Sequence, residues 1–352
     1  MMLSNELKDR ERDILKLMAQ GLTNSQIGNS LYLARETVRW YNKQIYSKLG
    51  VHNRTHAVTR AQELGLLENF GTIDNQPLPK IQYVKSGDAY IAYQVIGNGP
   101  VDVLYMSGFI SHLECEWEQP RCAWAYRRIA SNSRLIIMDK RGVGLSDRVN
   151  DSPDLEQTVQ DMRAVLEAVG SQEAVVASSC EGAPAACLMA VRYPDSVQGL
   201  MLLNGIVKGS RSVEFPWAMP VSMYNHIFDA VREEWGGPYA LDYFAPEADS
   251  EFRQWWAKFL RQAASPSVAL QSVEMMRDID MTAILPDVKA PTLVIHARHN
   301  MVVRVEAGRY IADNIPNARY VEIPTRSHLW WWDADVYVNE IESFLENIYD
   351  SL

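Results

Sequence analysis

Short apolar runs recur along most of the chain, and longer stretches with apolar residues at helical spacing separate them. The runs bounded by turn-forming residues are 101–105, 135–138, 174–177, 199–203 and 292–296. Apolar runs of this length fit buried strands. Strands that alternate with helices form a mostly parallel sheet covered by helices on both faces. The pattern therefore predicts an α/β fold for this part of the chain.

The first 67 residues show a different pattern, with apolar residues at helical spacing and no strand-like run. Helices are predicted at about 14–18, 27–31, 36–49 and 56–65. Short helices with a tight turn before the third are typical of a helix-turn-helix, whose later helix enters the major groove of DNA. We therefore predict a small all-α helix-turn-helix domain. If the apolar stripe of its third helix faces the core, Arg39, Trp40 and Lys43 face outward together, although Trp40 would also suit a half-buried packing position.

A segment rich in turn-forming residues separates the two patterns. From Asn69 to Pro79 the sequence has no periodicity and contains Gly, Asn and Pro, which indicates a linker. We place the helical domain at 1–67, the linker at 68–79 and the α/β domain at 80–352. A chain of 352 residues is long enough for each domain to have its own core.

Composition argues against a membrane or metal protein. No stretch approaches the roughly 18 consecutive apolar residues of a membrane span. Charged residues occupy the place where a secretory signal would be apolar, so we expect no membrane partner and a cytoplasmic location. The four cysteines lack the paired spacing of a zinc site, and most of them fit small core residues. No metal and no cofactor are expected.

The net charge is divided unevenly between the two parts. The whole chain carries −10, yet residues 1–70 hold 10 Lys and Arg against 7 Asp and Glu. The acidic remainder repels phosphate, so any contact with nucleic acid belongs to the basic N-terminal part.

Small and polar residues follow most of the predicted strands. These segments are Ser107-Gly108-Phe109, 139–146, the turn at 178–182, Arg298-His299-Asn300 and, near the C-terminal end, Ser327-His328. Reactive groups in parallel sheets gather at the carboxyl ends of the strands. We therefore expect one site that draws on all of these segments.

The turn after the third run has the form of a nucleophile elbow with a cysteine at its centre. Residues 174–187 read AVVASSCEGAPAAC, an apolar strand followed by a helix of small residues. An elbow needs small residues two before and two after the nucleophile, because the backbone there is crowded and strained. Ser178 and Gly182 fill those positions around Cys180.

Four segments of the helical domain closely resemble the LuxR-type (GerE-like) DNA-binding domain. They are RERDIL at 10–15, QGLTNSQI at 20–27, ETVR at 36–39 and KLGVHNRT at 48–55. The resemblance implies four DNA-facing residues, Thr37, Arg39, Trp40 and Lys43. It also implies that the fourth helix dimerises, so DNA and a second copy of the chain, in a homodimer, are expected partners. Ala34 departs from the family, which usually has a capping serine there, and a lost N-cap typically costs about 0.5–2 kcal/mol.

The segments at the strand ends resemble the α/β-hydrolase fold, across essentially the whole second domain. By this resemblance Cys180 stands at the position of the nucleophile and His328 at that of the general base. The backbone N–H groups of Phe109 and Glu181 would form an oxyanion hole. Asn300 stands where the family has an Asp. The elbow is similar to the Ser-Glu-Gly-Gly elbow of hydrolase-like domains that are fused to signalling modules.

Cys180 and Asn300 are mutually consistent departures from the hydrolase pattern. An Asp orients the histidine and stabilises its cation, whereas an Asn can only orient the ring. That loss is severe for a serine but smaller for a thiol, whose reference pKa is about 8.5 and falls further beside a cationic histidine. Cys, His and Asn form a functional set of catalytic residues in papain-like proteases. Cys180 is therefore a nucleophile, a contact residue in a slow or binding-only site, or a structural residue. His328 is a general base, or a buried histidine whose hydrogen bonds are made within the core.

The stretch at about 206–285 is rich in aromatic and methionine side chains. In this fold it normally forms a helical lid over the nucleophile. Such side chains make an adaptable apolar pocket wall, although most of them also suit the core of the lid itself. The expected pocket residues are Phe109, Cys180, Trp217, Met219, Met223 and Trp330. A small, apolar or aromatic ligand is expected.

The fusion of a DNA-binding domain to a hydrolase-like domain favours a ligand-responsive transcription regulator, because a metabolic hydrolase gains nothing from a DNA-reading domain. The alternative is a cysteine-dependent esterase or lactonase that the DNA-binding domain localises or regulates. A third interpretation is an interaction protein with an inactive pocket.

Overall fold

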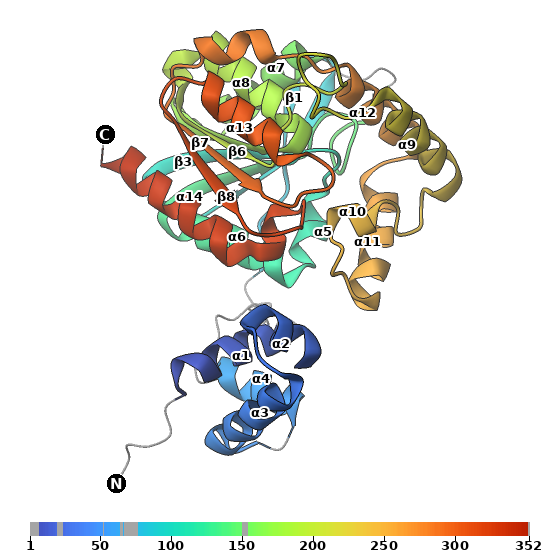
Figure 1. Cartoon of the computed structure of the whole chain (residues 1–352). Coiled ribbons are helices and arrows are strands. Elements are labelled where there is room, and N and C mark those ends of the chain that lie inside the picture. Colours follow the sequence, from blue (N-terminus) through green and yellow to red (C-terminus); the bar gives the residue numbers. More distant parts are fainter. Residues whose placement is uncertain are drawn as a thin grey trace. The chain divides into compact units, whose positions relative to one another are not determined.

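The computed structural model describes residues 7–19, 24–51, 53–63, 66, 77–149 and 154–350. The chain divides into two compact units, Met1–Asn75 and Gln76–Leu352 (Figure 1). Most of the predicted linker lies outside the described residues. The first unit is helical and the second is α/β, so the predicted fold class is confirmed.

The described part of the N-terminal unit consists of α1 (Asp9–Ala19), α2 (Asn24–Leu31), α3 (Arg35–Leu49) and α4 (Arg54–Glu63). Its small core comes from the apolar stripes of these helices and includes Ile14, Leu15, Ile27, Val38 and Ile45. A partly buried ion pair ties α3 to α1, with Lys48 Nζ 2.6 Å from Glu11 Oε2. The third helix ends at Gly50, whose φ of 67° is the left-handed conformation of a helix C-cap.

An eight-stranded sheet forms the centre of the second unit, in the order β1-β2-β4-β3-β5-β6-β7-β8. The strands are β1 (Gln82–Ser86), β2 (Ala89–Ile96), β3 (Val101–Met106), β4 (Ser133–Met138), β5 (Ala174–Ser179), β6 (Val197–Leu203), β7 (Thr292–Ala297) and β8 (Ala318–Ile323). The pairs β1–β2 and β2–β4 are antiparallel, and every other pair is parallel. The mostly parallel sheet is therefore confirmed.

The five apolar runs in the sequence correspond to β3–β7, which helices cover on both faces. Strands β1, β2 and β8 do not correspond to any of these apolar runs. In β1 and β8 every residue except the last is half-buried or exposed, so polar side chains interrupt them. An edge strand that faces water on one side leaves an alternating pattern rather than a continuous run.

Two layers of helices enclose the sheet (Figure 1). Helices α7 (Leu155–Ala168), α8 (Ala183–Arg192) and α13 (Val305–Asn314) bury their apolar faces in the main core. Helices α6 (Pro120–Asn132) and α14 (Ala334–Tyr349) pack against each other in the other layer. The short helix α5 (Leu113–Trp117) follows the loop after β3.

The predicted lid region folds into helices between β6 and β7. These are α9 (Val221–Glu234), α10 (Leu241–Phe244), α11 (Ser250–Ala263) and α12 (Pro266–Asp278). Asp249 and Ser265 cap α11 and α12 by accepting hydrogen bonds from backbone N–H groups of the first turn. None of the helices in the described part of the chain has the length and apolar character of a membrane span.

Candidate functional site

Cys180 lies on a strained turn between β5 and α8. Its φ of 49° falls in the left-handed region, which a side chain rarely adopts outside special sites. The surroundings are too tight for larger residues, since a Cβ added to Gly108 would lie 2.7 Å from Cys180 Cβ. A Cβ on Gly182 would lie 3.1 Å from Ser178 Cβ. The local geometry is therefore that of a nucleophile elbow, which explains the small residues seen in the sequence.

A cavity of about 50 Å³ opens beside this turn. Its walls come from the elbow, the loop after β3, α5, the lid and the segment around His328. The lining residues are Tyr105, Ser107, Gly108, Phe109, Ile110, Glu116, Ser179, Cys180, Phe244, Trp255, Trp256, Phe259, His328, Leu329, Trp330 and Trp331. Four residues named from the sequence, Phe109, Cys180, His328 and Trp330, thus meet at one cavity.

Three predicted pocket residues of the lid region lie elsewhere. Trp217 packs against Phe215 and Tyr310, with ring centroids 5.7 and 5.8 Å away. Met223 is 46% exposed, and Met219 forms an isolated β-bridge with Ser210. The abundance of large side chains in this region does not show which of them face the cavity.

Helix α11 supplies the inward-facing wall instead. Trp255, Trp256 and Phe259 line the cavity, and Phe244 joins them from α10. Their spacing on α11 is that of one helical face, because residues three and four apart lie above each other. That periodicity was the signal in the sequence that could have identified them.

Asn300 contacts His328, and the direction of this hydrogen bond is fixed. The side-chain oxygen Oδ1 of Asn300 accepts from the backbone N–H groups of Val302 and Val303, at 2.9 and 3.1 Å. Its Nδ2 therefore faces His328 Nδ1, 3.0 Å away, and must donate to it. A flipped amide would set an NH₂ group against two N–H donors.

A histidine that accepts at Nδ1 carries its hydrogen on Nε2 when it is neutral. This is the tautomer opposite to that of a Ser-His-Asp triad, where the acid accepts from Nδ1–H and leaves Nε2 free to take a proton. The sequence led us to expect that Asn300 orients the ring. The structure brings the two side chains together but turns the ring into a donor at Nε2.

Burial keeps both His328 and Cys180 uncharged at neutral pH. Desolvation, with a smaller contribution from His296, lowers the pKa of His328 to about 3. Desolvation and then the charge of Glu181 raise the pKa of the Cys180 thiol well above its usual value. The thiolate and imidazolium pair of a cysteine hydrolase is therefore disfavoured in this arrangement.

Lys140 connects the two residues of the expected oxyanion hole. Its Nζ lies 2.9 Å from Glu181 Oε1 and 3.3 Å from the backbone oxygen of Phe109, and all of these groups are buried. The other carboxylate oxygen of Glu181, Oε2, is buried without a hydrogen-bond partner.

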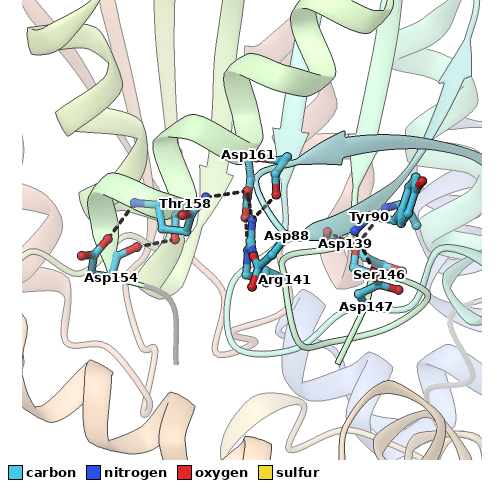
Figure 2. Close-up of polar contacts among 12 residues, drawn as sticks. Asp88, Tyr90, Asp139, Arg141, Ser146, Asp147, Asp154, Thr158 and Asp161 are labelled. Atoms are coloured by element: carbon cyan, nitrogen blue, oxygen red, sulfur yellow. Dashed lines mark hydrogen bonds and ion pairs between the residues drawn. The ribbon is translucent and has the colours of Figure 1, made fainter. Parts of the chain in front are cut away.

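The two residues that flank Lys140 in the loop after β4, Asp139 and Arg141, are charged and make several polar contacts (Figure 2). Arg141 makes a two-pronged contact with Asp161 of α7, at 3.0 and 2.7 Å, and reaches Asp88 at 2.6 Å. Asp139 accepts from Ser111 Oγ at 2.6 Å and from backbone N–H groups. A Cβ on Gly144, whose φ is 55°, would lie 2.1 Å from Asp139 Oδ2, so only glycine fits there.

The cavity also contains polar groups that were not identified from the sequence. Glu116 of α5 accepts from Tyr126 Oη at 2.6 Å and is 5% exposed. Tyr105 accepts from Trp330 Nε1 at 2.8 Å and lies 3.2 Å from Ser179 Oγ. No pattern in the sequence distinguishes Glu116 from the exposed Glu114, because the fold alone decides which of them is buried.

The predicted DNA-facing residues share a side of α3. Arg39 and Lys43 are exposed, Thr37 is half-buried, and Trp40 is 56% exposed with its ring edge-on to Tyr41 at 5.0 Å. The opposite side of the helix supplies the core residues named above. At the start of α3, Ala34 makes no side-chain cap, as its residue type predicts.

Comparison with known proteins supports both parts of this architecture. Residues 5–61 match the family of bacterial regulatory proteins, luxR family, and residues 123–335 match the serine aminopeptidase S33 family. The AB hydrolase superfamily protein YisY of Bacillus subtilis is 24% identical over 219 residues, which are 61% of this chain and 81% of that protein. The DNA-binding transcriptional activator DevR/DosR of Mycobacterium tuberculosis is 45% identical over 58 residues, 16% of this chain and 27% of the activator.

A solved esterase from Exiguobacterium antarcticum has the same fold as the second unit. The TM-score is 0.67 at 18% identity, over 75% of this chain and 99% of the esterase. At this identity the likeness extends to the fold alone.

Proposed function

We propose that this chain, which belongs to the serine aminopeptidase S33 family and carries a luxR-family DNA-binding domain, is a transcription regulator whose affinity for DNA depends on a small ligand. The ligand binds in the cavity beside Cys180, and its occupancy controls the helix-turn-helix domain. The regulator acts in the cytoplasm as a homodimer that α4 helps to form, and it reads sites with matching symmetry.

The direction of the bond between Asn300 and His328 is the observation that carries this proposal. A neutral His328 with hydrogen on Nε2 can donate to a carbonyl group but cannot accept the proton of the Cys180 thiol. The strained elbow at Cys180 supports this proposal, because an elbow sets the backbone N–H of the next residue where it can donate to the oxygen of a carbonyl compound. The site lacks the base that would turn the compound over.

The second candidate is a cysteine-dependent esterase or lactonase, and the strained backbone of Cys180 favours it. Strain at a single residue persists only where the surrounding structure maintains it, and it is common at nucleophiles. This candidate needs His328 to release its bond with Asn300 and change tautomer during each cycle.

Intact-protein mass spectrometry after incubation with panels of esters and lactones separates the candidates. A receptor gives reversible binding without product, or a stable adduct on Cys180. An enzyme gives product without a lasting adduct. Rapid turnover by the wild-type protein would overturn the receptor proposal.

A further inference from the structure

Gln94 is a buried glutamine in β2 that the chemistry of the elbow does not use. It is 1% exposed, and both halves of its side-chain amide are bonded. Its Oε1 accepts from the indole N–H of Trp117, and its Nε2 donates to the backbone oxygen of Pro79, each at 2.8 Å. An indole N–H can only donate and a carbonyl oxygen can only accept, so the orientation of the amide is fixed. These three residues, which we call the Gln94 bridge, join three separate segments of the chain.

At one end, the Gln94 bridge holds the point where the chain enters the second unit. Pro79 is the last residue of the predicted linker and lies three residues before β1. Pro77 and Pro79 restrict the backbone around Leu78, because a proline fixes its own φ and favours an extended conformation in the residue before it. The bond to the oxygen of Pro79 therefore helps to set the direction in which the chain enters this unit. The linker is the covalent connection to the helix-turn-helix domain.

At the other end, the Gln94 bridge reaches the wall of the cavity beside Cys180. Trp117 is the last residue of α5, and its neighbour Glu116 lines the cavity. Tyr126 of α6 contacts both residues. Its Oη donates to Glu116 Oε2 at 2.6 Å, and its ring lies edge-on to Trp117 with centroids 5.6 Å apart. Because all three side chains are buried in a close-packed interior, a displacement of Glu116 also moves Trp117.

The small size of the cavity makes such a displacement necessary for most ligands. A volume of about 50 Å³ admits only a few atoms, so a larger molecule has to move one of the walls, and α5 is one of them. A shift of α5 by about 1 Å would break the bond between Trp117 and Gln94 or draw the amide away from Pro79, because hydrogen bonds tolerate little lengthening. A buried polar group that loses its partner is costly, so the two ends of the bridge respond together.

We propose that the Gln94 bridge couples occupancy of the cavity to the linker: a ligand that displaces α5 releases the backbone of Pro79. The inference rests on the proposed function, because it specifies how the same cavity acts on the helix-turn-helix domain. The lid is the competing wall. Its helix α11 contains no member of the bridge, so a ligand that displaces only the lid leaves Pro79 held.

Trypsin cleavage after Lys80 reports how firmly Pro79 is held. Lys80 is exposed, and the sequence has no Lys or Arg at 61–79, so this cut yields a fragment of residues 81–352 that intact-mass spectrometry identifies. The segment has to leave the surface of the unit before trypsin can bind it, and the cleavage rate then follows the population of the released form. The measurement uses the full-length protein and needs no ligand.

Two variants open the bridge. Gln94→Met removes both bonds at nearly constant side-chain length, and we expect cleavage after Lys80 to become about fivefold faster, as the loss of one hydrogen bond allows. Trp117→Phe keeps a ring but removes the donor, so it should speed cleavage as well, even if Gln94→Met does not fold. Trp235→Phe is the matched control, because it removes an indole bond to the backbone of Ala264 at a residue that does not line the cavity. Its cleavage rate should equal that of the wild type.

A double-mutant cycle tests whether the cavity wall is coupled to Pro79. Tyr126→Phe deletes the hydroxyl group that binds Glu116 and leaves the bridge itself intact. We expect it to speed cleavage about twofold in the wild-type background and not at all in Gln94→Met or Trp117→Phe, where the bridge is already open. The same factor in both backgrounds would overturn the proposal. So would a wild-type rate in Tyr126→Phe, or in both variants that open the bridge.

The effect on DNA is measured separately. Protein purified from its host is compared with the same protein stripped of bound small molecules, on one DNA fragment selected by the full-length chain. The two dissociation constants should differ at least about fivefold in the wild type and in Trp235→Phe, but less than about twofold in Gln94→Met. A fivefold difference that persists in Gln94→Met would overturn the inference, because the signal would bypass the bridge. Equal constants in the wild type would overturn the regulator proposal instead, while the cleavage rates still decide whether the cavity and Pro79 are coupled.

Discussion

The side-chain amide of Asn300 donates to Nδ1 of His328, 3.0 Å away, because two backbone N–H groups already occupy its oxygen. A carboxylate at this position could accept from all three groups at once. An amide has only one acceptor oxygen, and its nitrogen can only donate, so it cannot accept from all three groups. The substitution therefore changes which ring nitrogen carries hydrogen, in addition to removing a charge.

Asn300→Asp should create a hydrolase from the binding site. The new carboxylate accepts from Nδ1–H, which frees Nε2 as a base and stabilises the imidazolium. Loss of this carboxylate from a Ser-His-Asp triad costs about 10⁴ in turnover, so we expect a gain of at least about tenfold in the hydrolysis of p-nitrophenyl acetate. Cys180→Ala in the same background is the control and should abolish the gain. Identical rates in wild type and Asn300→Asp would contradict the assigned tautomer.

Cys180→Ser should show no esterase activity by itself. A serine hydroxyl needs a stronger base than a thiol does, and His328 offers none while Asn300 is present. Combined with Asn300→Asp, the serine should become active, since the full triad is then restored. The four rates of the double-mutant cycle, measured with p-nitrophenyl acetate, give the coupling between the two positions. Higher activity in Cys180→Ser than in the wild type would contradict the interpretation of positions 180 and 300 as matched substitutions.

Lys140→Met should destabilise the second unit. The change leaves the carboxylate of Glu181 buried without a cation, and breaking such a pair typically costs about 3–5 kcal/mol. Urea unfolding of the full-length protein measures the loss. Lys85→Met, at an exposed lysine, is the control and should stay within about 0.5 kcal/mol of the wild type. Glu181→Gln added to Lys140→Met should recover most of the stability, and no recovery would mean that the ion pair is not the cause.

Lys43→Ala should weaken DNA binding to about the same extent for different sequences. The ammonium group on the exposed side of α3 is expected to contact phosphate, so its loss should lower the salt slope of binding by about 1. Lys16→Ala is a suitable control, because Lys16 is also exposed but lies on α1. DNA fragments selected by the full-length protein from a random pool serve as targets. An unchanged affinity and slope in Lys43→Ala would mean that α3 does not contact DNA as predicted.

The sequence predicted those parts of the fold in which local chemistry and burial agree. Strands β3–β7 are buried on both faces, so their continuous apolar runs were visible. The elbow was visible for a similar reason, since crowding at Cys180 permits only small neighbours. Strands β1 and β8 were missed because exposure breaks their apolar runs into alternation.

The sequence predicted several residues of the site but only part of the site's chemistry. Asn300 and His328 were paired from the hydrolase pattern, yet the direction of their bond depends on where the backbone N–H groups of Val302 and Val303 point. Within the lid, composition could not separate Trp255, which faces the cavity, from Trp217, which packs outside it. Such choices arise from tertiary packing and have no local signature.

The affinity for DNA with and without the native ligand tests the central claim most directly. Full-length protein purified from its host is compared with the same protein stripped of bound small molecules, on one selected DNA fragment. We predict dissociation constants that differ at least about fivefold, in line with typical coupling between two sites, and that return when the extracted fraction is added back. Equal dissociation constants for both preparations, while an extracted compound rebinds the cavity beside Cys180, would contradict the claim.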